Sequence, residues 1–328
     1  MQKLFVFGSA RIDAFLELPD SLAGEACRLD TKDCFLELSY AAKLPLNRVT
    51  FCVGGNGANV AVGCKRLGID ITLVAELGCG PIADYAKKEL GKEIDLALVT
   101  QTEGIKEGFG AVIVYHGERT ILSYYSPGRP PFPDNLEAAE WAYLTSVGEN
   151  FEDFFDDFYV WLKKNKTRLA FNPGGRQMKK GRKWLGRYLE KTEVLLVNRE
   201  EAEEIVGRSD THGKEKELLN FVSATGPKSV IITDGANGAY AKENTNYYHI
   251  GILPVDAISR TGAGDAFSAG CLSALIKGKT LPEALIWGTV NSTSVIGYVG
   301  PQTGLLKESG MATWMDRARS SGVRVEKF

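Results

Sequence analysis

The sequence contains little of what several common classes of functional site require. Only three histidines occur in 328 residues, at positions 116, 212 and 249, and no His-Glu-x-x-His segment is present. A zinc site is therefore not expected. No Gly-x-Ser-x-Gly segment occurs either, which argues against a serine hydrolase.

The chain also lacks an excess of positive charge and a long apolar segment. The 39 basic residues nearly balance the 41 acidic ones, which gives a net charge of −2. Nucleic acid is therefore not an expected partner, because binding to its backbone needs a concentrated positive field. No apolar run approaches the ~18 residues of a membrane span, and the apolar stretch at 4–7 is too short for a secretory signal. We expect this stretch to be a buried first strand.

The six cysteines do not form a recognisable motif. They stand at 27, 34, 52, 64, 79 and 271, without a Cys-x-x-Cys pair. A chain of this length has enough core-forming residues to fold without disulfide bonds. We therefore expect reduced thiols in a cytoplasmic protein.

The second half of the chain alternates between apolar runs and helical segments. Strands are expected at 168–172, 194–197 and 229–233, with helices after Asn198 and from 262 to about 275. This alternation predicts an α/β fold with a doubly wound, mostly parallel central sheet flanked by helices. The 36 glycines, about 11% against a norm of ~7%, predict many tight turns or close approaches to a ligand.

The first 125 residues interrupt this alternation with β-segments. The runs 109–115 and 120–125 flank a short turn, which indicates a hairpin. The segments at about 12–18, 33–53 and 105–125 are expected to form a small sheet that serves as a lid. No linker or repeat divides the chain, so we expect a single domain over residues 1–328.

The segment Arg260-Thr-Gly-Ala-Gly-Asp-Ala-Phe-Ser-Ala-Gly270 suits an anion. Small residues lead directly into a helix whose first N–H groups are unpaired and whose dipole is positive at that end. Gly262, Ala263 and Gly264 would let a phosphate approach the backbone. Asp265 repels such an anion, but its carboxylate can accept a proton from a substrate hydroxyl. The alternative is that Asp265 only caps the helix.

A second glycine-rich segment runs from Gly54 to Gly63 and places two carboxamides among glycines. It fits neither a dinucleotide-binding fingerprint nor a P-loop. Its residues Gly55, Asn56, Gly57 and Asn59 suit hydrogen bonding to a polyhydroxyl compound. The alternative is a helix entry with asparagines as turn residues.

Together, these two segments resemble the signatures of the ribokinase-like, or PfkB-type, carbohydrate kinase family. The resemblance implies transfer of the γ-phosphoryl group of ATP to a sugar hydroxyl, with ATP and Mg²⁺ as cofactors. It implies that Asp265 is the general base and that the amides of Gly262, Ala263 and Gly264 hold the developing charge. The other roles that it implies are sugar contact by Asp13, magnesium and phosphate contact by Asn198 and Glu201, and nucleotide contact by Thr233, Gly235, Gly238 and Asn291.

Some residues depart from the family pattern. Members often carry Lys where this chain has Asn56 and Asn where it has Arg11. Ser259 stands where many members have the Asp that supports a monovalent cation. These differences argue against activation by a monovalent cation and against ribose as the substrate.

Two further residues are candidates for substrate contact. Glu149 follows the segment Ser146-Val-Gly, and Arg11 lies two residues before Asp13 on the same strand face. Arg11 suits an acidic substrate, such as a sugar acid or sugar phosphate. The alternative is that Arg11 pairs with Asp13 or with another carboxylate.

Three functions remain open from the sequence. The first is an ATP-dependent sugar kinase, and the second is a nucleoside kinase in which Phe109, Tyr124 or Tyr125 stacks on a base. The same aromatic residues can instead pack the lid sheet. The third is an inactive sugar-binding sensor, which predicts loss of Asp265 or of the magnesium motif, yet both are present. An exposed edge of the lid sheet also offers a surface for a homodimer.

Overall fold

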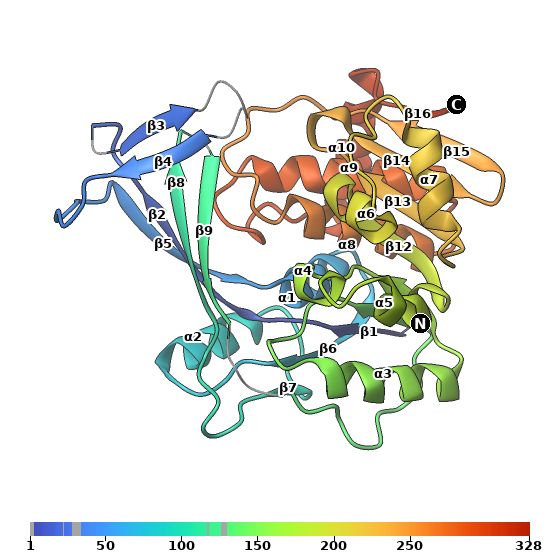
Figure 1. The fold of residues 1–328 in the computed structure, drawn as a ribbon, viewed down its shortest axis with the longest axis horizontal. Coiled ribbons are helices and arrows are strands. Elements are labelled where there is room, and N and C mark those ends of the chain that lie inside the picture. Colours follow the sequence, from blue (N-terminus) through green and yellow to red (C-terminus); the bar gives the residue numbers. More distant parts are fainter. Residues whose placement is uncertain (1–2, 22, 28–33, 117, 126–129) are drawn as a thin grey trace.

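The computed structural model describes residues 3–21, 23–27, 34–116, 118–125 and 130–328. Its main body is built around one large sheet (Figure 1). In spatial order the strands are β16 (Val325–Lys327), β15 (Asn246–Ile250), β14 (Ala239–Glu243), β13 (Ser229–Thr233), β12 (Thr192–Asn198), β11 (Arg168–Phe171), β10 (Trp141–Leu144), β1 (Lys3–Phe7), β6 (Asp70–Glu76) and β7 (Val99–Thr100). The strands from β13 to β7 pair in parallel, and β14, β15 and β16 extend the sheet in antiparallel fashion.

Helices cover both faces of this sheet, as the alternating sequence predicts. One face packs against α1 (Asn56–Arg66), α2 (Pro81–Leu90), α8 (Ala263–Ile276), α9 (Leu281–Ile296) and α10 (Glu308–Ser320). The other packs against α3 (Glu152–Asn165), α4 (Gly175–Met178), α5 (Arg182–Leu189), α6 (Arg199–Val206) and α7 (Glu215–Ser223). A short 3₁₀ turn, η1 (Gly235–Asn237), follows β13.

Strand β1 shows why the sheet needs cover on both faces. Leu4 and Val6 belong to one hydrophobic core, whereas Phe5 and Phe7 belong to the other. Successive side chains of a strand point to opposite faces, so a strand that is apolar throughout must be buried on both. The expected doubly wound, mostly parallel sheet is confirmed.

A separate small sheet projects from the main body, at the left of Figure 1. It consists of β5 (Arg48–Gly54), β2 (Arg11–Glu17), β8 (Phe109–Tyr115) and β9 (Glu118–Tyr124), in that spatial order. The two-stranded pair β3 (Ala23–Cys27) and β4 (Cys34–Leu38) lies beside it. Apart from β3, these strands lie in the segments expected to form a lid. The lid function stays a prediction.

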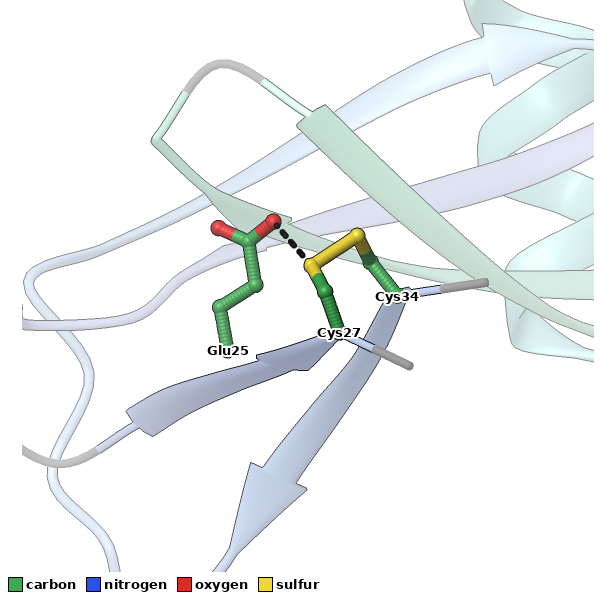
Figure 2. Close-up of side chains that lie close together, drawn as sticks. All are labelled: Glu25, Cys27 and Cys34. Carbon is green, nitrogen blue, oxygen red and sulfur yellow. Dashed lines mark hydrogen bonds between the residues drawn. A yellow bond between two sulfur atoms is a disulfide. The ribbon is translucent and has the colours of Figure 1, made fainter. Parts of the chain in front are cut away.

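One expectation about cysteine is wrong. Cys27 and Cys34 form a disulfide bond between β3 and β4, although the sequence predicts reduced thiols (Figure 2). The antiparallel register places the two residues directly opposite each other, with their Cα atoms 4.0 Å apart. The spacing of seven residues gives no such signal until the hairpin is known. Cys52, Cys64, Cys79 and Cys271 are free thiols.

The same hairpin contains a group of potential metal ligands, namely Glu25, Cys27 and Cys34 (Figure 2). Glu25 Oε1 lies 3.4 Å from the Sγ atom of Cys27. The two sulfur atoms are bonded to each other, so neither offers the thiolate that a metal ion needs. Among the described residues, no other cluster of this kind is present.

Several apolar side chains of the small sheet are exposed, including Phe51, Leu122 and Tyr124. An exposed apolar sheet surface is a common site of self-association. The homodimer through this sheet stays a prediction. No helix in the described part of the chain is long and apolar enough to cross a membrane.

Candidate active site

Polar residues gather at the carboxyl edge of the parallel strands. Thr145, Asn172 and Asn198 stand at or just after the ends of β10, β11 and β12. Asn172 Nδ2 donates a 2.7 Å hydrogen bond to the carbonyl of Leu196, and Thr145 Oγ1 donates to Asn172 Oδ1 at 3.2 Å. Ligands of open α/β sheets bind at this edge. The two bonds therefore hold the side chains of Thr145 and Asn172 in place at the edge where a ligand is expected.

Helix α8 begins at this edge without a side-chain cap. Its N-cap residue Gly262 has a φ of 81°, and a Cβ atom there would lie 2.5 Å from Cβ of Pro301. Only glycine therefore fits this position. The amide of Ala263 makes a long bond of 3.4 Å to the carbonyl of Arg260. The absence of a cap leaves the positive end of α8 open to an anion.

Asp265 stands in the first turn of α8 but does not cap it. Its Oδ2 accepts a 2.7 Å hydrogen bond from Nδ2 of Asn59 in α1. Gln302 Nε2 in turn donates to Asn59 Oδ1 at 3.1 Å, which fixes the orientation of the Asn59 amide. The glycine-rich segment and the helix start therefore meet through this pair.

Burial raises the pKa of Asp265 from 3.8 to about 7. The Asn59 hydrogen bond and the Arg11 charge oppose this shift, whereas the charges of Glu201 and Asp13 add to it. Asp265 is nevertheless partly exposed, because it lines a cavity. A carboxyl group with this pKa exchanges its proton readily near neutral pH.

This cavity, which we call the α8 cavity, brings together residues that are far apart in the sequence. It is lined by Asn56, Asn172, Asn198, Glu201, Thr233, Gly264, Asp265 and Ser268, together with apolar side chains. Five of these residues, Asn56, Asn198, Glu201, Thr233 and Gly264, are predicted site residues that share the cavity with Asp265.

Asn198 and Glu201 form a capping box at the start of α6. Asn198 Oδ1 accepts from the Glu201 amide at 2.8 Å, and Glu201 Oε2 accepts from the Asn198 amide at 2.9 Å. Burial raises the pKa of Glu201, and the neighbouring charges of Glu200 and Glu204 raise it further. Burial and these charges disfavour the ionised form of Glu201, and a cation in the α8 cavity would stabilise that form. Carboxylate and amide oxygens are the ligands that Mg²⁺ prefers, so the donor set fits it.

Asp13 lies buried in the middle of the small sheet, in contact with Arg11. A Cβ atom on Gly54 or on Gly110 would lie 2.1 Å or 2.0 Å from its carboxylate oxygens, so both neighbouring strands need glycine there. Arg11 Nε lies 2.8 Å from Asp13 Oδ1. Burial raises the pKa of Asp13, and the Arg11 charge opposes that shift. The pairing considered as an alternative for Arg11 is therefore present.

Comparison with known proteins identifies the family. The family model described as pfkB family carbohydrate kinase matches residues 26–308. The chain belongs to the pfkB carbohydrate kinase family. It is 25% identical over 263 residues to the ATP-dependent 6-phosphofructokinase of Thermoanaerobacterium thermosaccharolyticum, which covers 75% of this chain and 80% of that protein. It is 26% identical over 262 residues to the ribokinase of Staphylococcus aureus, which covers 77% of this chain and 84% of that protein.

A solved structure shows the same fold. The structure of Arabidopsis thaliana ribokinase complexed with ribose and ATP superposes with a TM-score of 0.77 at 18% identity, over 96% of this chain and 98% of that one. The resemblance that the sequence motifs carry is thus confirmed, and the chain is an ATP-dependent carbohydrate kinase.

In this kinase, the glycines of the second motif serve close packing. A Cβ atom on Gly55, whose φ is 94°, would lie 2.5 Å from the carbonyl oxygen of Ser9. A Cβ atom on Gly57 would lie 2.6 Å from the carbonyl carbon of Gly8. The motif therefore packs α1 directly against the loop after β1, and this contact positions Asn59 beside Asp265.

The loop after β13 is held by an arginine that the sequence motifs do not single out. Arg199 is only 2% exposed and pairs with Asp234 at 2.9 Å and with Glu215 at 3.0 Å. Gly235 and Gly238 of this loop have φ values of 51° and 84°. The sequence feature that could have pointed to Arg199 is its position directly after Asn198. Arg199 ties the start of α6 to the predicted nucleotide loop.

Two further predicted site residues do not line the α8 cavity. Asn291 is fully buried in α9, where Nδ2 donates to the carbonyl of Ala266 at 2.7 Å and Oδ1 accepts from the Leu306 amide at 2.9 Å. Its amide thus holds α9 against α8, and the nucleotide contact of Asn291 stays a prediction. Glu149 is outside the α8 cavity and lies 3.5 Å from Nη2 of Arg176.

Proposed function

We propose that this kinase transfers the γ-phosphoryl group of ATP to a hydroxyl group of a sugar or sugar derivative, with Asp265 as general base. The observation that carries this proposal is the placement of Asp265. Its carboxyl group has a pKa of about 7 and lines a cavity at the uncapped start of α8. A base is most effective when its pKa lies near the working pH.

The reaction needs one proton transfer and one exchange of bonds at phosphorus. The acceptor hydroxyl gives its proton to Asp265, and its oxygen forms a bond to the γ-phosphorus. The bond from that phosphorus to the β,γ-bridging oxygen breaks, and ADP leaves with the electron pair. Asn59 holds Oδ2 of Asp265, so Oδ1 is the oxygen that receives the proton.

The start of α8 would hold the charge on the transferred phosphoryl group. We assign this role first to the amide of Gly264, a residue at which an added Cβ atom would meet nothing within 4 Å. Ala263 must first give up its long bond to Arg260. Fixed N–H dipoles of this kind cost no reorganisation during the reaction. The small sheet, as a lid, would exclude water and so limit hydrolysis of ATP.

Asn198 and Glu201 would hold Mg²⁺, largely through water. When bound, the ion offsets charge on the phosphate oxygens. We expect Glu201→Gln to raise the magnesium concentration needed for half-maximal rate, because it removes a charge that orients the hydrated ion. Gln can still accept the Asn198 amide, so the capping box survives. An unchanged magnesium titration would show that Glu201 serves only in the capping box of α6.

The pH dependence of kcat/KM should report the Asp265 carboxyl group. The base acts only when ionised, and burial has raised its pKa to about 7. Activity should therefore fall as the pH drops through about 7, by roughly tenfold for each further unit. Asn59→Leu removes the hydrogen bond that lowers this pKa, so the acid limb should move to higher pH. A profile flat from pH 5 to 8 contradicts the assignment.

An ADP-release assay with a panel of acceptors tests the proposal as a whole. The panel contains neutral sugars, sugar acids, sugar phosphates and nucleosides, each with Mg²⁺ and ATP. Phosphorylation of a sugar or sugar derivative is the expected result. Preference for nucleosides supports the nucleoside kinase instead, which is the second function that the sequence leaves open. Binding of sugar without any turnover supports the inactive sensor instead.

A further inference from the structure

The loop between α9 and α10, residues 297–307, contacts both glycine-rich segments of the site. We call it the α9–α10 loop. Its Pro301 packs against Gly262 at the start of α8, where an added Cβ atom would lie 2.5 Å from Cβ of Pro301. Its Gln302 donates from Nε2 to Oδ1 of Asn59 in α1 at 3.1 Å. The position of this loop therefore bears on both segments.

Two hydrogen bonds in line connect Gln302 to the proposed base. Gln302 Nε2 donates to Asn59 Oδ1, and Asn59 Nδ2 donates to Asp265 Oδ2 at 2.7 Å. Asn59 is buried, with 4% of its surface exposed, and Gln302 is half-buried. This network sets the orientation of the Asn59 amide. Because its oxygen is occupied by Gln302, the amide presents only its NH₂ group to Asp265.

An amide fixed in this orientation acts differently on the two forms of a carboxyl group. The ionised form of Asp265 accepts a charge-assisted bond from Asn59, whereas the protonated form accepts only a weaker, neutral one. A protonated carboxyl group can also donate its proton in a hydrogen bond, but an NH₂ group cannot accept it. An amide that is free to turn would serve both forms. The fixed amide therefore favours the ionised form, which is the one that can act as a base.

Arg66, at the end of α1, holds the backbone of the α9–α10 loop. Its Nη1 donates to the carbonyl of Gln302 at 2.7 Å and to that of Leu305 at 3.3 Å. Its Nε and Nη2 donate to the carboxylate of Glu93 at 3.2 Å and 2.6 Å. A guanidinium group that binds a carboxylate through two N–H groups has a fixed plane. The remaining edge of Arg66 is thus directed at the loop.

The same loop is also held from α9. Ser294 Oγ donates to the carbonyl of Gly304 at 2.7 Å. Arg66 and Asn59 stand seven residues apart in α1, which is about two turns, so they share one face of that helix. Helix α1 therefore contacts the loop twice, once through the Gln302 backbone and once through its side chain.

We propose that Gln302 is a positioning residue of this kinase, which fixes the Asn59 amide so that Asp265 is held in its proton-accepting form, and that Arg66 fixes Gln302. This inference rests on the proposed role of Asp265 as general base and extends it to two residues outside the glycine-rich segments. The structural alternative is that these bonds only pack the α9–α10 loop against α1.

Four other groups act on Asp265 through their charge or polarity, namely Glu201 in α6, Asp13 and Arg11 in β2, and Tyr143 in β10. The two carboxylates raise the pKa of Asp265, and the Arg11 charge lowers it. Burial holds the pKa of Tyr143 well above its usual range, so this group stays neutral near pH 7. A substitution of one uncharged side chain by another leaves all four groups in place.

Carbon NMR of protein labelled at the aspartate carboxyl groups tests the inference directly. The Asp265 signal is the one that Asp265→Asn lacks. We expect Gln302→Leu to raise the midpoint of its titration by roughly half to one pH unit, because the Asn59 amide becomes free to turn. Gln302→Glu should raise it further, since an acceptor at this position turns the Asn59 NH₂ group away from Asp265 and adds a negative charge.

Thr303→Val is the matched control for these variants. Thr303 follows Gln302 in the same loop, and its hydroxyl group donates to the carbonyl of Val299 at 3.1 Å. This variant should leave the Asp265 titration unchanged, and melting temperatures show that each variant is folded. An unchanged midpoint in folded Gln302→Leu overturns the inference, as does an equal shift in Thr303→Val.

The pH profile of kcat/KM separates this inference from the proposed function. The acid limb of Gln302→Leu should move by the same amount as the NMR midpoint of Asp265. A moved midpoint with an unmoved acid limb supports the positioning by Gln302 but contradicts the role of Asp265 as base. An unmoved midpoint overturns the positioning and leaves that role intact.

Arg66→Met tests the second part of the proposal. It should raise the Asp265 midpoint by no more than Gln302→Leu does, because it releases the loop but leaves the Gln302 side chain in place. The double variant Arg66→Met/Gln302→Leu should show no larger shift than Gln302→Leu alone, since coupled residues are not additive. Additive shifts would show that Arg66 acts on Asp265 by another route and would contradict its role.

Discussion

Replacement of Asp265 by asparagine should lower kcat by ~10²–10⁴-fold, the usual contribution of a general base. Binding of ATP and of the acceptor should change little, because Asn keeps the size of the side chain and its place in α8. The carbonyl oxygen of the new amide can still accept the 2.7 Å bond from Asn59. Initial rates and the KM for each substrate measure the effect.

The same variant should be more stable than the parent, and increasingly so at high pH. Burial raises the Asp265 pKa from 3.8 to about 7, so the folded state binds this proton more tightly than the unfolded chain. Ionisation of the parent therefore disfavours the folded state progressively between about pH 4 and 7, and asparagine avoids this cost. The gain in melting temperature should be larger at pH 8 than at pH 5.

Two outcomes would contradict this role. A variant that keeps more than about half of its kcat would make Asp265 a structural residue. A loss of melting temperature at both pH values would show that the carboxylate stabilises α8 instead. Asp316→Asn serves as the control, because Asp316 is an exposed residue of α10 that pairs only locally with Arg319. It should match the parent in both assays.

The parts of the fold that follow from local patterns could be predicted. Apolar runs such as 194–197 and 229–233 must be covered on both faces, and this fixes the parallel sheet. Gly262-Ala263-Gly264-Asp265 combines small residues with a helix start, and the structure places it at the α8 cavity. These signals are local, so the sequence carries them directly.

The parts that depend on distant contacts could not be predicted. The bond between Asn59 and Asp265 joins residues 206 positions apart. Arg176 is one arginine among many in the sequence, and only the fold stacks it on Tyr125. The Cys27–Cys34 disulfide needs the register of β3 and β4. The hydrogen bonds of Asn291 to backbone groups of Ala266 and Leu306 also depend on the fold, because these residues lie 25 and 15 positions away in the sequence.

Substitution of Gly264 by valine should lower kcat on the order of 10²-fold, comparable to the loss of an oxyanion donor, without unfolding the protein. A Cβ atom at this position meets nothing within 4 Å, and the backbone there is helical, so the protein itself leaves room for a side chain. Valine also has a higher helix propensity than glycine. Since a Cβ atom there meets no described residue within 4 Å, we expect the valine to crowd a phosphoryl group bound at the start of α8.

Gly186→Val is the matched control for this prediction. Gly186 is also a helical glycine, in α5, and a Cβ atom there would likewise meet nothing within 4 Å. Both variants should keep the melting temperature of the parent, and only Gly264→Val should lose turnover. Gly264→Ala should fall between them, because a single methyl group crowds the phosphoryl oxygens less than a branched side chain. Normal turnover in a folded Gly264→Val variant would place the phosphoryl group elsewhere, because a branched side chain at this position should crowd an anion held by the Gly264 amide.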